Sequence, residues 1–201
     1  MPDRQQRPCL RRQDLMRDLA TLDRALYETV TVTRTPALDT ALRRLSTAAD
    51  HSKISFAAAA LLALFPGRPR RAALLGVAAV GVASATANLV GKRLVRRPRP
   101  HRAADSPFPG RHVPMPQSAS FPSGHTASAV AFAAAVSPAL PGASVPLGLL
   151  ACAVGYSRVH TGVHYPGDVV AGAVLGTGAA AVALAAVGPV LDWQPCRRYR
   201  H

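Results

Sequence analysis

Cysteine is scarce in this chain of 201 residues, which contains only three. Cys9, Cys152 and Cys196 are far apart, odd in number and without paired spacing, so neither a disulfide framework nor a structural zinc site is indicated. The N-terminus carries arginines but lacks an apolar core of signal-peptide length, and we expect no cleaved targeting segment. Repeats and low-complexity segments are also missing beyond the alanine-rich stretches, and the length fits one domain.

Acidic residues are scarce as well, because 10 Asp and Glu stand against 24 Lys and Arg, giving a formal net charge of +14. On charge alone, nucleic acid, an anionic lipid surface and a phosphorylated substrate are all candidate partners. Apolar residues make up 49% of the chain and include long Ala, Val, Leu and Gly stretches, which is typical of a polytopic membrane protein. The mean hydropathy is modest because roughly the first fifty residues are polar.

The apolar stretches predict an all-α, polytopic transmembrane helix bundle of five to six spans. The first candidate, Ser52 to Pro66, is only about 22 Å long, short of a roughly 30 Å hydrocarbon core, so we place its start upstream near Thr47. The other four candidates are 72–90, 126–140, 145–156 and 169–191. We divide the chain into an N-terminal part (1–47), a transmembrane domain (48–191) and a basic tail (192–201).

The N-terminal part is predicted to begin with a basic, irregular arm, Met1 to Arg12, and to continue as two amphipathic helices. Both should lie along the membrane surface or dock on the bundle, since charged residues fill their other faces. The second helix begins at Thr35-Pro36, a cap followed by a proline in the first helical position. The apolar faces are Leu15, Leu19, Leu22 and Leu26 in the first helix and Leu38, Leu42 and Leu45 in the second.

Five spans bring two polar loops to the same membrane face, because the second and fourth spans end there and the third and fifth begin there. These loops, 92–125 and 157–168, hold most of the unusual polar residues, whereas the opposite turns hold only Arg, Gly and Pro. Polar groups at the ends of membrane helices are usually functional. The loops should therefore converge on one site.

The first polar cluster is the basic run from Lys92 to Pro100. Lys92 lies where the dipole of the second span favours a cation, and Pro100 forces Arg99 into an extended conformation, so both can point into the loop space. Taken alone, the run is also typical of a solvated or headgroup-binding surface.

The second cluster, Ser120 to Thr126, lies where the third span begins. Its proline and glycine shape a turn, and the free N–H groups of a helix start form an anion site. His125 would sit over that site and donate a proton to a departing oxygen. A capped helix with a surface histidine is the alternative.

The third cluster is Ser157 to Asp168, which includes an arginine, Arg158, suited to bidentate phosphate binding. Pro166 falls at a first helical position, so Asp168 is in the first turn of the last span and can bond His164 just before it. A carboxylate on one imidazole nitrogen leaves the other free as a base or nucleophile. Such a pair is often only structural, and for His160 we favour packing or hydrogen bonding.

Taken together, the motifs Lys-x6-Arg-Pro, Pro-Ser-Gly-His and Ser-Arg-x5-His-x3-Asp resemble the signature of the type 2 phosphatidic acid phosphatase superfamily. The resemblance covers roughly Ala48 to Leu191. The amphipathic N-terminal part also resembles the phosphatase half of actinobacterial proteins fused to a diacylglycerol kinase, although no kinase half is present. The matching residues are Lys92, Arg99 and Pro100; Pro122, Ser123, Gly124 and His125; and Ser157, Arg158, His164 and Asp168.

The resemblance implies a phosphatase that needs neither metal nor other cofactor. His164 would attack phosphorus and form a phosphohistidine, while Asp168 orients it. His125 would protonate the leaving oxygen and then activate the hydrolytic water. The phosphoryl oxygens would be held by Lys92, Arg99, Arg158 and the Ser123 and Gly124 amides.

The substrate must present phosphate at the headgroup level, so we expect a lipid phosphate or pyrophosphate in the bacterial plasma membrane and no nucleic acid among the partners. Phosphatidic acid, phosphatidylglycerol phosphate and a polyprenyl pyrophosphate such as undecaprenyl pyrophosphate all fit. A polyprenyl-phosphoryl sugar phosphate of cell-wall synthesis is the alternative. The positive-inside rule, with 18 Lys and Arg on the active-site face and 6 opposite, favours a cytoplasmic site over a periplasmic one.

Three other classes are compatible with parts of this pattern. A transporter or channel predicts polar groups near mid-membrane, whereas here they cluster at the helix ends. A non-enzymatic protein that binds anionic lipid predicts the basic loops without a need for both histidines. A zinc hydrolase using His125, His164, Asp168 and His160 predicts loss of activity with a chelator.

Overall fold

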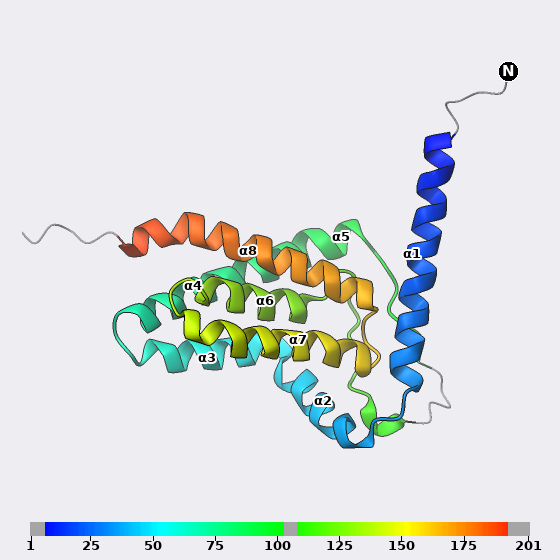
Figure 1. Ribbon diagram of the computed structural model, residues 1–201, viewed down its shortest axis with the longest axis horizontal. Helices are drawn as coiled ribbons and strands as arrows, with labels where there is room; N and C mark the ends of the chain where they lie inside the picture. The colour runs from blue at the N-terminus through cyan, green and yellow to red at the C-terminus, as the bar shows by residue number, and fades with distance from the viewer. Residues whose placement is uncertain (1–6, 103–107, 193–201) are drawn as a thin grey trace, which may run out of the picture.

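The computed structural model describes residues 7–102 and 108–192, and within them the regular secondary structure is entirely helical (Figure 1). A π-helix, η2 (Thr86–Gly91), joins α4 to α5 so that 68–94 forms one continuous rod. Short 3-10 turns lie at Asp50–Ser52, Pro109–Arg111 and Pro141–Ala143. The α-helices are α1 (Arg7–Val32), α2 (Pro36–Ala48), α3 (Lys53–Ala63), α4 (Arg68–Ala85), α5 (Lys92–Leu94), α6 (Gly124–Val136), α7 (Ser144–His160) and α8 (Pro166–Asp192).

The bundle is built around α6, which packs against α4, α7 and α8. Its interior is mostly alanine, so helix backbones approach closely, as small residues allow in membrane bundles. The approach of α8 to α6 is the tightest, because a side chain at Gly172 or Gly176 would collide with the carbonyl oxygen of Ser123 or Ala127. One of the two buried clusters of this core consists of Leu75, Ala79, Ala83, Ala127, Ala131, Ala135, Ala179, Ala180 and Ala183.

Three helical stretches of the described chain are long and apolar enough to cross a membrane, namely 68–94, 141–160 and 166–191. The predicted first and third spans correspond to α3 and α6, which are shorter, with 11 and 13 residues. The expectation that the first span starts near Thr47 is wrong. His51 and Ser52 both adopt left-handed backbone angles (φ of 55° and 58°), which interrupt the helical backbone between α2 and α3.

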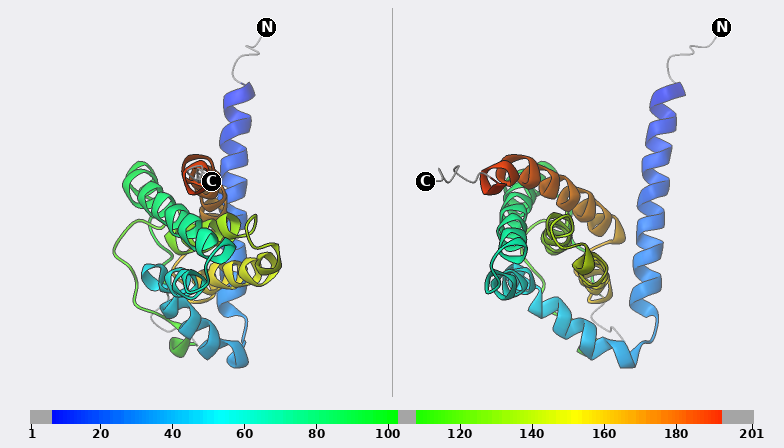
Figure 2. Two further views of the ribbon diagram at one scale, coloured as in Figure 1. Left: turned by 90° about the vertical axis from the view of Figure 1, so that its left-hand side faces the viewer. Right: turned by 60° about the vertical axis from the view of Figure 1, so that its left-hand side comes forward.

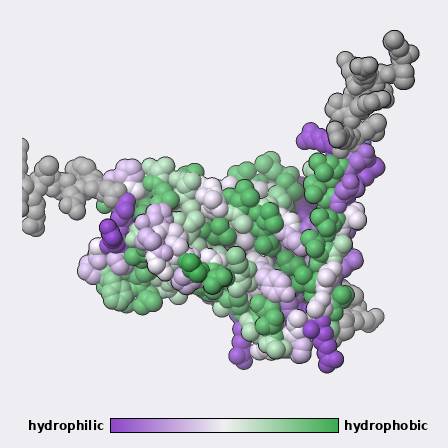
Figure 3. All heavy atoms as spheres, viewed as in Figure 1, coloured by the Kyte–Doolittle hydropathy of each residue, from purple (hydrophilic) through white to green (hydrophobic). Residues whose placement is uncertain are grey.

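The two predicted N-terminal helices are present as α1 and α2, and Pro36 opens α2 as expected. The predicted irregular arm is wrong from Arg7 onward, where α1 begins, while residues 1–6 and 193–201 lie outside the described residues. α1 runs across the direction of α4, α6, α7 and α8 (Figures 1 and 2), and an apolar band follows its length (Figure 3). That band contains Leu15, Leu19, Leu22 and Leu26, all exposed. A helix of this kind fits a position along the membrane surface.

The predicted convergence of the two polar loops is confirmed. Arg102 donates hydrogen bonds to the carbonyl oxygens of Thr161 (2.8 Å) and Gly162 (3.3 Å). The backbone N–H of Ser120 in turn donates to Arg97 O within the first loop (2.9 Å). Both loops therefore lie at one end of the bundle. α1 and α2 also reach this end.

Candidate active site

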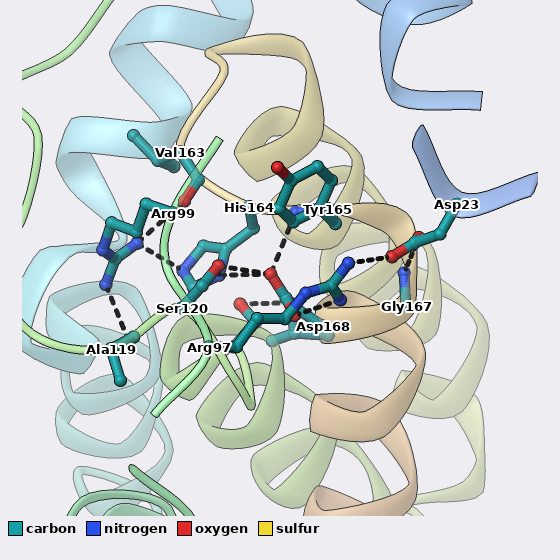
Figure 4. A network of polar contacts seen from close by, with 12 residues as sticks. Asp23, Arg97, Arg99, Ala119, Ser120, Val163, His164, Tyr165, Gly167 and Asp168 are labelled. Carbon is teal, nitrogen blue, oxygen red and sulfur yellow. Dashed lines mark hydrogen bonds and ion pairs between the residues drawn. The ribbon is translucent and has the colours of Figure 1, made fainter. Parts of the chain in front are cut away.

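His164 sits in a tight turn between α7 and α8. Gly162, at a φ of +71°, reverses the chain after α7, and the N–H groups of Val163 and His164 donate to Arg158 O at 3.1 and 3.2 Å. α8 then starts at Pro166, as predicted, which places Asp168 in its first turn. His164 Nδ1 lies 3.5 Å from Asp168 Oδ2, so the predicted pair is brought together (Figure 4).

The carboxylate of Asp168 is buried and fully engaged. Its Oδ2 accepts hydrogen bonds from the Ser120 hydroxyl and from the N–H of Tyr165 (3.0 Å). Its Oδ1 accepts from Arg97 at 2.9 Å. Ser120 Oγ is also 3.4 Å from His164 Nδ1, so the serine links the carboxylate and the imidazole. These bonds fix the carboxylate, and with it the orientation of the His164 ring.

The other ring nitrogen of His164, Nε2, lies 3.2 Å from an Arg99 NH group. Burial of the ring is the main reason that the pKa of His164 falls to about 4, an effect that the hydrogen bond with Asp168 opposes. His164 is therefore neutral at pH 7. With its proton on Nδ1, toward Asp168, the lone pair on Nε2 is the nucleophilic one.

The Arg99 side chain is held in place by hydrogen bonds to the backbone of both loops. Its guanidinium donates to Val163 O at 2.8 Å and to Ser118 O at 2.8 Å. Desolvation lowers the pKa of Arg99, yet its bonds keep it beside His164. The Arg99 NH group that contacts His164 can thus donate its hydrogen bond to an anion that approaches Nε2.

A cavity of about 460 Å³ lies between residues of both polar loops and the segment between α2 and α3. Four predicted site residues line it, namely Lys92, Gly124, His125 and Arg158. Lys92 Nζ donates to Asn88 Oδ1 at 2.8 Å, and both residues come from the segment around the π-helix, a feature frequent at functional sites. His164, Ser123 and Asp168 are almost fully buried and are not among the residues that line the cavity.

Arg158 is 1% exposed but has unused hydrogen-bonding capacity. One NH group donates to Ser46 Oγ (2.6 Å) and Ser46 O (3.2 Å) of α2. Its buried Nε has no hydrogen-bond partner within 7–102 and 108–192. A buried guanidinium on a cavity wall with a donor to spare is suited to an anionic ligand.

The Pro-Ser-Gly-His turn joins the two halves of the site. The N–H of Ser123 donates to Asp168 O at 2.9 Å, and Ser123 Oγ accepts from Thr126 at 3.0 Å. The Ser123 amide is therefore engaged with α8 and is not free for phosphate, which differs from the expectation for this turn. Gly124, on the cavity wall, remains as the other predicted amide donor.

His125 lines the cavity and binds a carboxylate that the sequence did not indicate. Its Nε2 lies 2.8 Å from Asp50 Oδ1. The motif residues gave no reason to pair position 125 with position 50, because the two are 75 residues apart. Ser46, which bonds Arg158, was missed for the same reason.

His160 lies apart from this cavity in a buried contact with α2. Its Nε2 is 3.0 Å from Thr35 Oγ1 and 3.2 Å from Asp39 Oδ1, which fits the hydrogen-bonding role expected for it. Among the described residues, no group of three or more His, Cys, Asp or Glu side chains is arranged to hold a metal ion. The set proposed for a zinc site is thus divided among three places, because His164 pairs with Asp168, His125 with Asp50 and His160 with Asp39.

Arg97 and Asp23 form an outer layer behind the His164–Asp168 pair (Figure 4). Arg97 binds Asp168 with one NH group and Asp23 of α1 with the other, at 2.6 Å. Asp23 also accepts from the N–H of Gly167 at 2.6 Å, and Arg97 lies over the ring of Tyr165. Asp23 is the main unanticipated member, since it comes from a helix predicted only to be amphipathic.

Comparison with known proteins gives one matching family description, the PAP2 superfamily, over residues 73–190. A decaprenylphosphoryl-5-phosphoribose phosphatase of Mycobacterium tuberculosis is 38% identical over 157 residues, which cover 78% of this chain and 80% of the relative. The matched region contains all eight predicted site residues.

Two solved structures share the arrangement of helices, each with a TM-score of 0.68. The crystal structure of Aquifex aeolicus LpxE has 25% sequence identity and covers 82% of this chain and 95% of its own. The first transmembrane PAP2 type phosphatidylglycerolphosphate phosphatase from Bacillus subtilis has 21% identity, with coverages of 88% and 90%. At 21% identity, the likeness to the Bacillus subtilis structure concerns the fold alone.

Proposed function

Because the chain belongs to the PAP2 superfamily, whose motifs its sequence carries, we propose that it removes phosphate from a membrane lipid through a phosphohistidine at His164. It is a multi-pass membrane protein and a lipid phosphate phosphatase. The observation that carries the mechanism is the buried His164, held by Asp168 on one nitrogen and facing Arg99 with the other.

We infer that the substrate is a polyprenyl-phosphoryl sugar phosphate of the decaprenylphosphoryl-5-phosphoribose type. The relative from M. tuberculosis supports this alternative over phosphatidic acid, phosphatidylglycerol phosphate or a polyprenyl pyrophosphate. The cavity is compatible with it, because about 460 Å³ exceeds the space of one phosphate group and polar side chains line it. Asn88, Ser84 and Ser128 supply hydrogen-bonding groups suited to sugar hydroxyls.

In the first step, His164 Nε2 attacks phosphorus and the bond from phosphorus to the sugar oxygen breaks. Asp168 stabilises the positive charge that develops on the imidazole. Protonated His125 gives its proton to the departing oxygen, which leaves as the alcohol. The products of this step are a phosphohistidine and a neutral His125.

In the second step, water attacks the phosphohistidine from the side that the alcohol has left. His125 takes a proton from this water, and the bond between phosphorus and Nε2 breaks. Inorganic phosphate forms, and His164 returns to its neutral state with Nδ1 protonated toward Asp168. The cycle restores both histidines.

The phosphoryl oxygens are held by cations that are already in place before the substrate arrives. Lys92 and Arg158 contact these oxygens from the cavity wall. The Arg99 NH group that lies beside His164 donates a hydrogen bond to them. The Gly124 amide adds a neutral donor at the start of α6. Fixed donors of this kind favour the transition state because they need little reorganisation.

We also propose that α3 and α6 complete a five-span bundle and that the active-site end faces the cytoplasm. The charge distribution supports this orientation, and a periplasmic site is the alternative. The likeness to the phosphatase half of actinobacterial kinase fusion proteins is a further prediction, confined to the N-terminal helices.

The proposed function is tested by phosphate release from lipids in detergent with EDTA present. The panel is decaprenylphosphoryl-5-phosphoribose, phosphatidic acid, phosphatidylglycerol phosphate and undecaprenyl pyrophosphate. We expect the first to have the highest kcat/KM. His164→Ala should abolish release, whereas His101→Ala, at an exposed histidine of the first polar loop, should retain it.

Each contrary outcome points to a different revision. Loss of wild-type release with EDTA would favour the zinc hydrolase. A higher kcat/KM for phosphatidic acid would overturn the substrate but leave the chemistry intact. If no lipid in the panel released phosphate, a lipid-binding role would replace the proposed enzymatic role.

A further inference from the structure

Asp50 is not one of the motif residues, yet its carboxylate is in direct contact with His125. Its Oδ1 lies 2.8 Å from His125 Nε2. An ionised carboxylate can only accept, so Nε2 carries the proton in this bond. The other nitrogen, Nδ1, is then the one available to exchange a proton with a ligand.

The backbone around Asp50 is arranged to present this carboxylate. α2 ends at Ala48, and the two residues after Asp50, His51 and Ser52, are both left-handed before α3 begins at Lys53. Two successive non-glycine residues with positive φ are uncommon and tend to occur at functional sites. Asp50, His51 and Ser52 all line the cavity, so the break in the helix faces the site.

The surroundings of the pair are those of a group that must exchange protons. The side chains of His125 and Asp50 are 22% and 40% exposed, in contrast to the buried His164 and Asp168. The charged groups facing the pair are Arg158, with one NH group 3.8 Å from Asp50 Oδ1, and Lys92 across the cavity. Burial and the nearby charge of Arg158 lower the pKa of His125, and the Asp50 carboxylate is the group that opposes this and favours a protonated imidazole.

We propose that Asp50 is the positioning residue of the general acid, orienting His125 through Nε2 and stabilising its imidazolium so that Nδ1 delivers the proton to the leaving oxygen. The inference rests on the proposed function, because it assumes that His125 is the acid. Asp50 does not touch the phosphoryl group, and no bond to it forms or breaks. The site then contains two carboxylate–histidine pairs with opposite tasks, one nucleophilic and one acidic.

The test exploits the dependence of acid catalysis on the leaving group. Dodecyl phosphate has a poor leaving group that needs protonation, whereas a dodecyl-substituted para-nitrophenyl phosphate has a good one that does not. The kcat/KM of each substrate reports only the steps up to release of the alcohol, so dephosphorylation does not enter. The ratio of the two values cancels the amount of active enzyme and any change in binding common to both substrates.

For Asp50→Asn we expect kcat/KM for the dodecyl ester to fall on the order of 100-fold and that for the nitrophenyl ester to fall less than about 5-fold. Asp50→Glu, which keeps the carboxylate, should recover part of the loss. Asp18→Asn, at an exposed aspartate of α1, should leave both values unchanged. His125→Ala should show the same selective loss as Asp50→Asn, at least as large.

An equal loss for both substrates with Asp50→Asn would reduce Asp50 to a structural tether and overturn the inference. A gain for both would do the same, since the carboxylate would then compete with phosphate beside Arg158. If His125→Ala is selective and Asp50→Asn is not, only the role of Asp50 fails. If His125→Ala itself is not selective, the proposed acid is wrong and the proposed mechanism fails with it.

Discussion

At the scale of single residues, the site contains two histidines that each contact a carboxylate but lie in different surroundings. His164 and Asp168 are buried, and burial keeps His164 neutral with a lone pair on Nε2. His125 and Asp50 are partly exposed on a cavity wall, where protons can exchange with water. As we propose, the same pair of residue types provides a nucleophile in one place and an acid in the other.

The lowered pKa of His164 predicts a specific loss of stability in acid. Its pKa is about 4 in the folded protein and about 6.5 when unfolded, so between these values the unfolded chain binds more protons. Stability is therefore full above pH 6.5 and falls as the pH drops toward 4. At pH 5 we expect this residue alone to lower the free energy of unfolding by about 2 kcal/mol.

The measurement is thermal unfolding of detergent-purified wild type and His164→Gln at pH 7 and pH 5. The variant cannot take up this proton, so the wild type should lose more stability between the two pH values. Other histidines contribute to both proteins and cancel in the comparison. An equal loss in the two proteins would show that His164 is not buried in its neutral form.

At the scale of elements, Arg97 ties three segments together, namely the first polar loop, α8 and α1. It bonds Asp168 at the start of α8 and Asp23 of α1. Both bonds contribute to raising the pKa of Arg97 against the effect of desolvation. α1, which lies across the bundle, is thereby connected to the carboxylate that contacts His164.

Arg97→Met should therefore lower both stability and kcat. It leaves buried Asp168 Oδ1 without its ion pair, at an expected cost of about 2 kcal/mol in the free energy of unfolding. We expect kcat to fall roughly 10-fold with little change in KM, because Asp168 orients His164 and does not touch substrate. Arg96→Met, at an exposed neighbour in the same run, is the matched control. Equal kinetics for the two variants would exclude Arg97 from positioning Asp168.

The elements that the sequence predicted well are those with strong local signals. Pro36 and Pro166 opened helices where expected, and the long apolar run 169–191 became α8. The start of the first span was misplaced because the left-handed residues His51 and Ser52 are neither Gly nor Asn and give no local sign of a break. The helical start at Arg7 was missed because its charges suggested an irregular arm.

At the scale of the whole molecule, the motif residues could be predicted because chain topology alone brings two loops to one end of the bundle. The residues supporting them could not, since Asp50, Ser46 and Asp23 act through packing of α1 and α2 against that end. Such long-range pairs leave no spacing pattern in a single sequence. The sequence thus indicated the motif residues but not the residues that hold them in place.

The bundle also accounts for how a lipid substrate reaches this site. The spans 68–94, 141–160 and 166–191 set the direction of the membrane normal, and α1 lies across it at the active-site end. The exposed leucines of α1 would then lie at headgroup depth, level with the cavity. The phosphate of a lipid substrate can enter at the membrane surface while the apolar chain of that lipid remains in the bilayer.

The most direct test of this account is rapid chemical quenching of the enzyme with lipid substrate labelled in its terminal phosphate, followed by peptide mapping. We expect an acid-labile, alkali-stable phosphate on the peptide that contains His164, and none in His164→Ala. A substrate with a good leaving group should make it accumulate in His125→Ala, where hydrolysis is slowed. Full phosphate release by His164→Ala, or a label on a different residue, would contradict the phosphohistidine at His164.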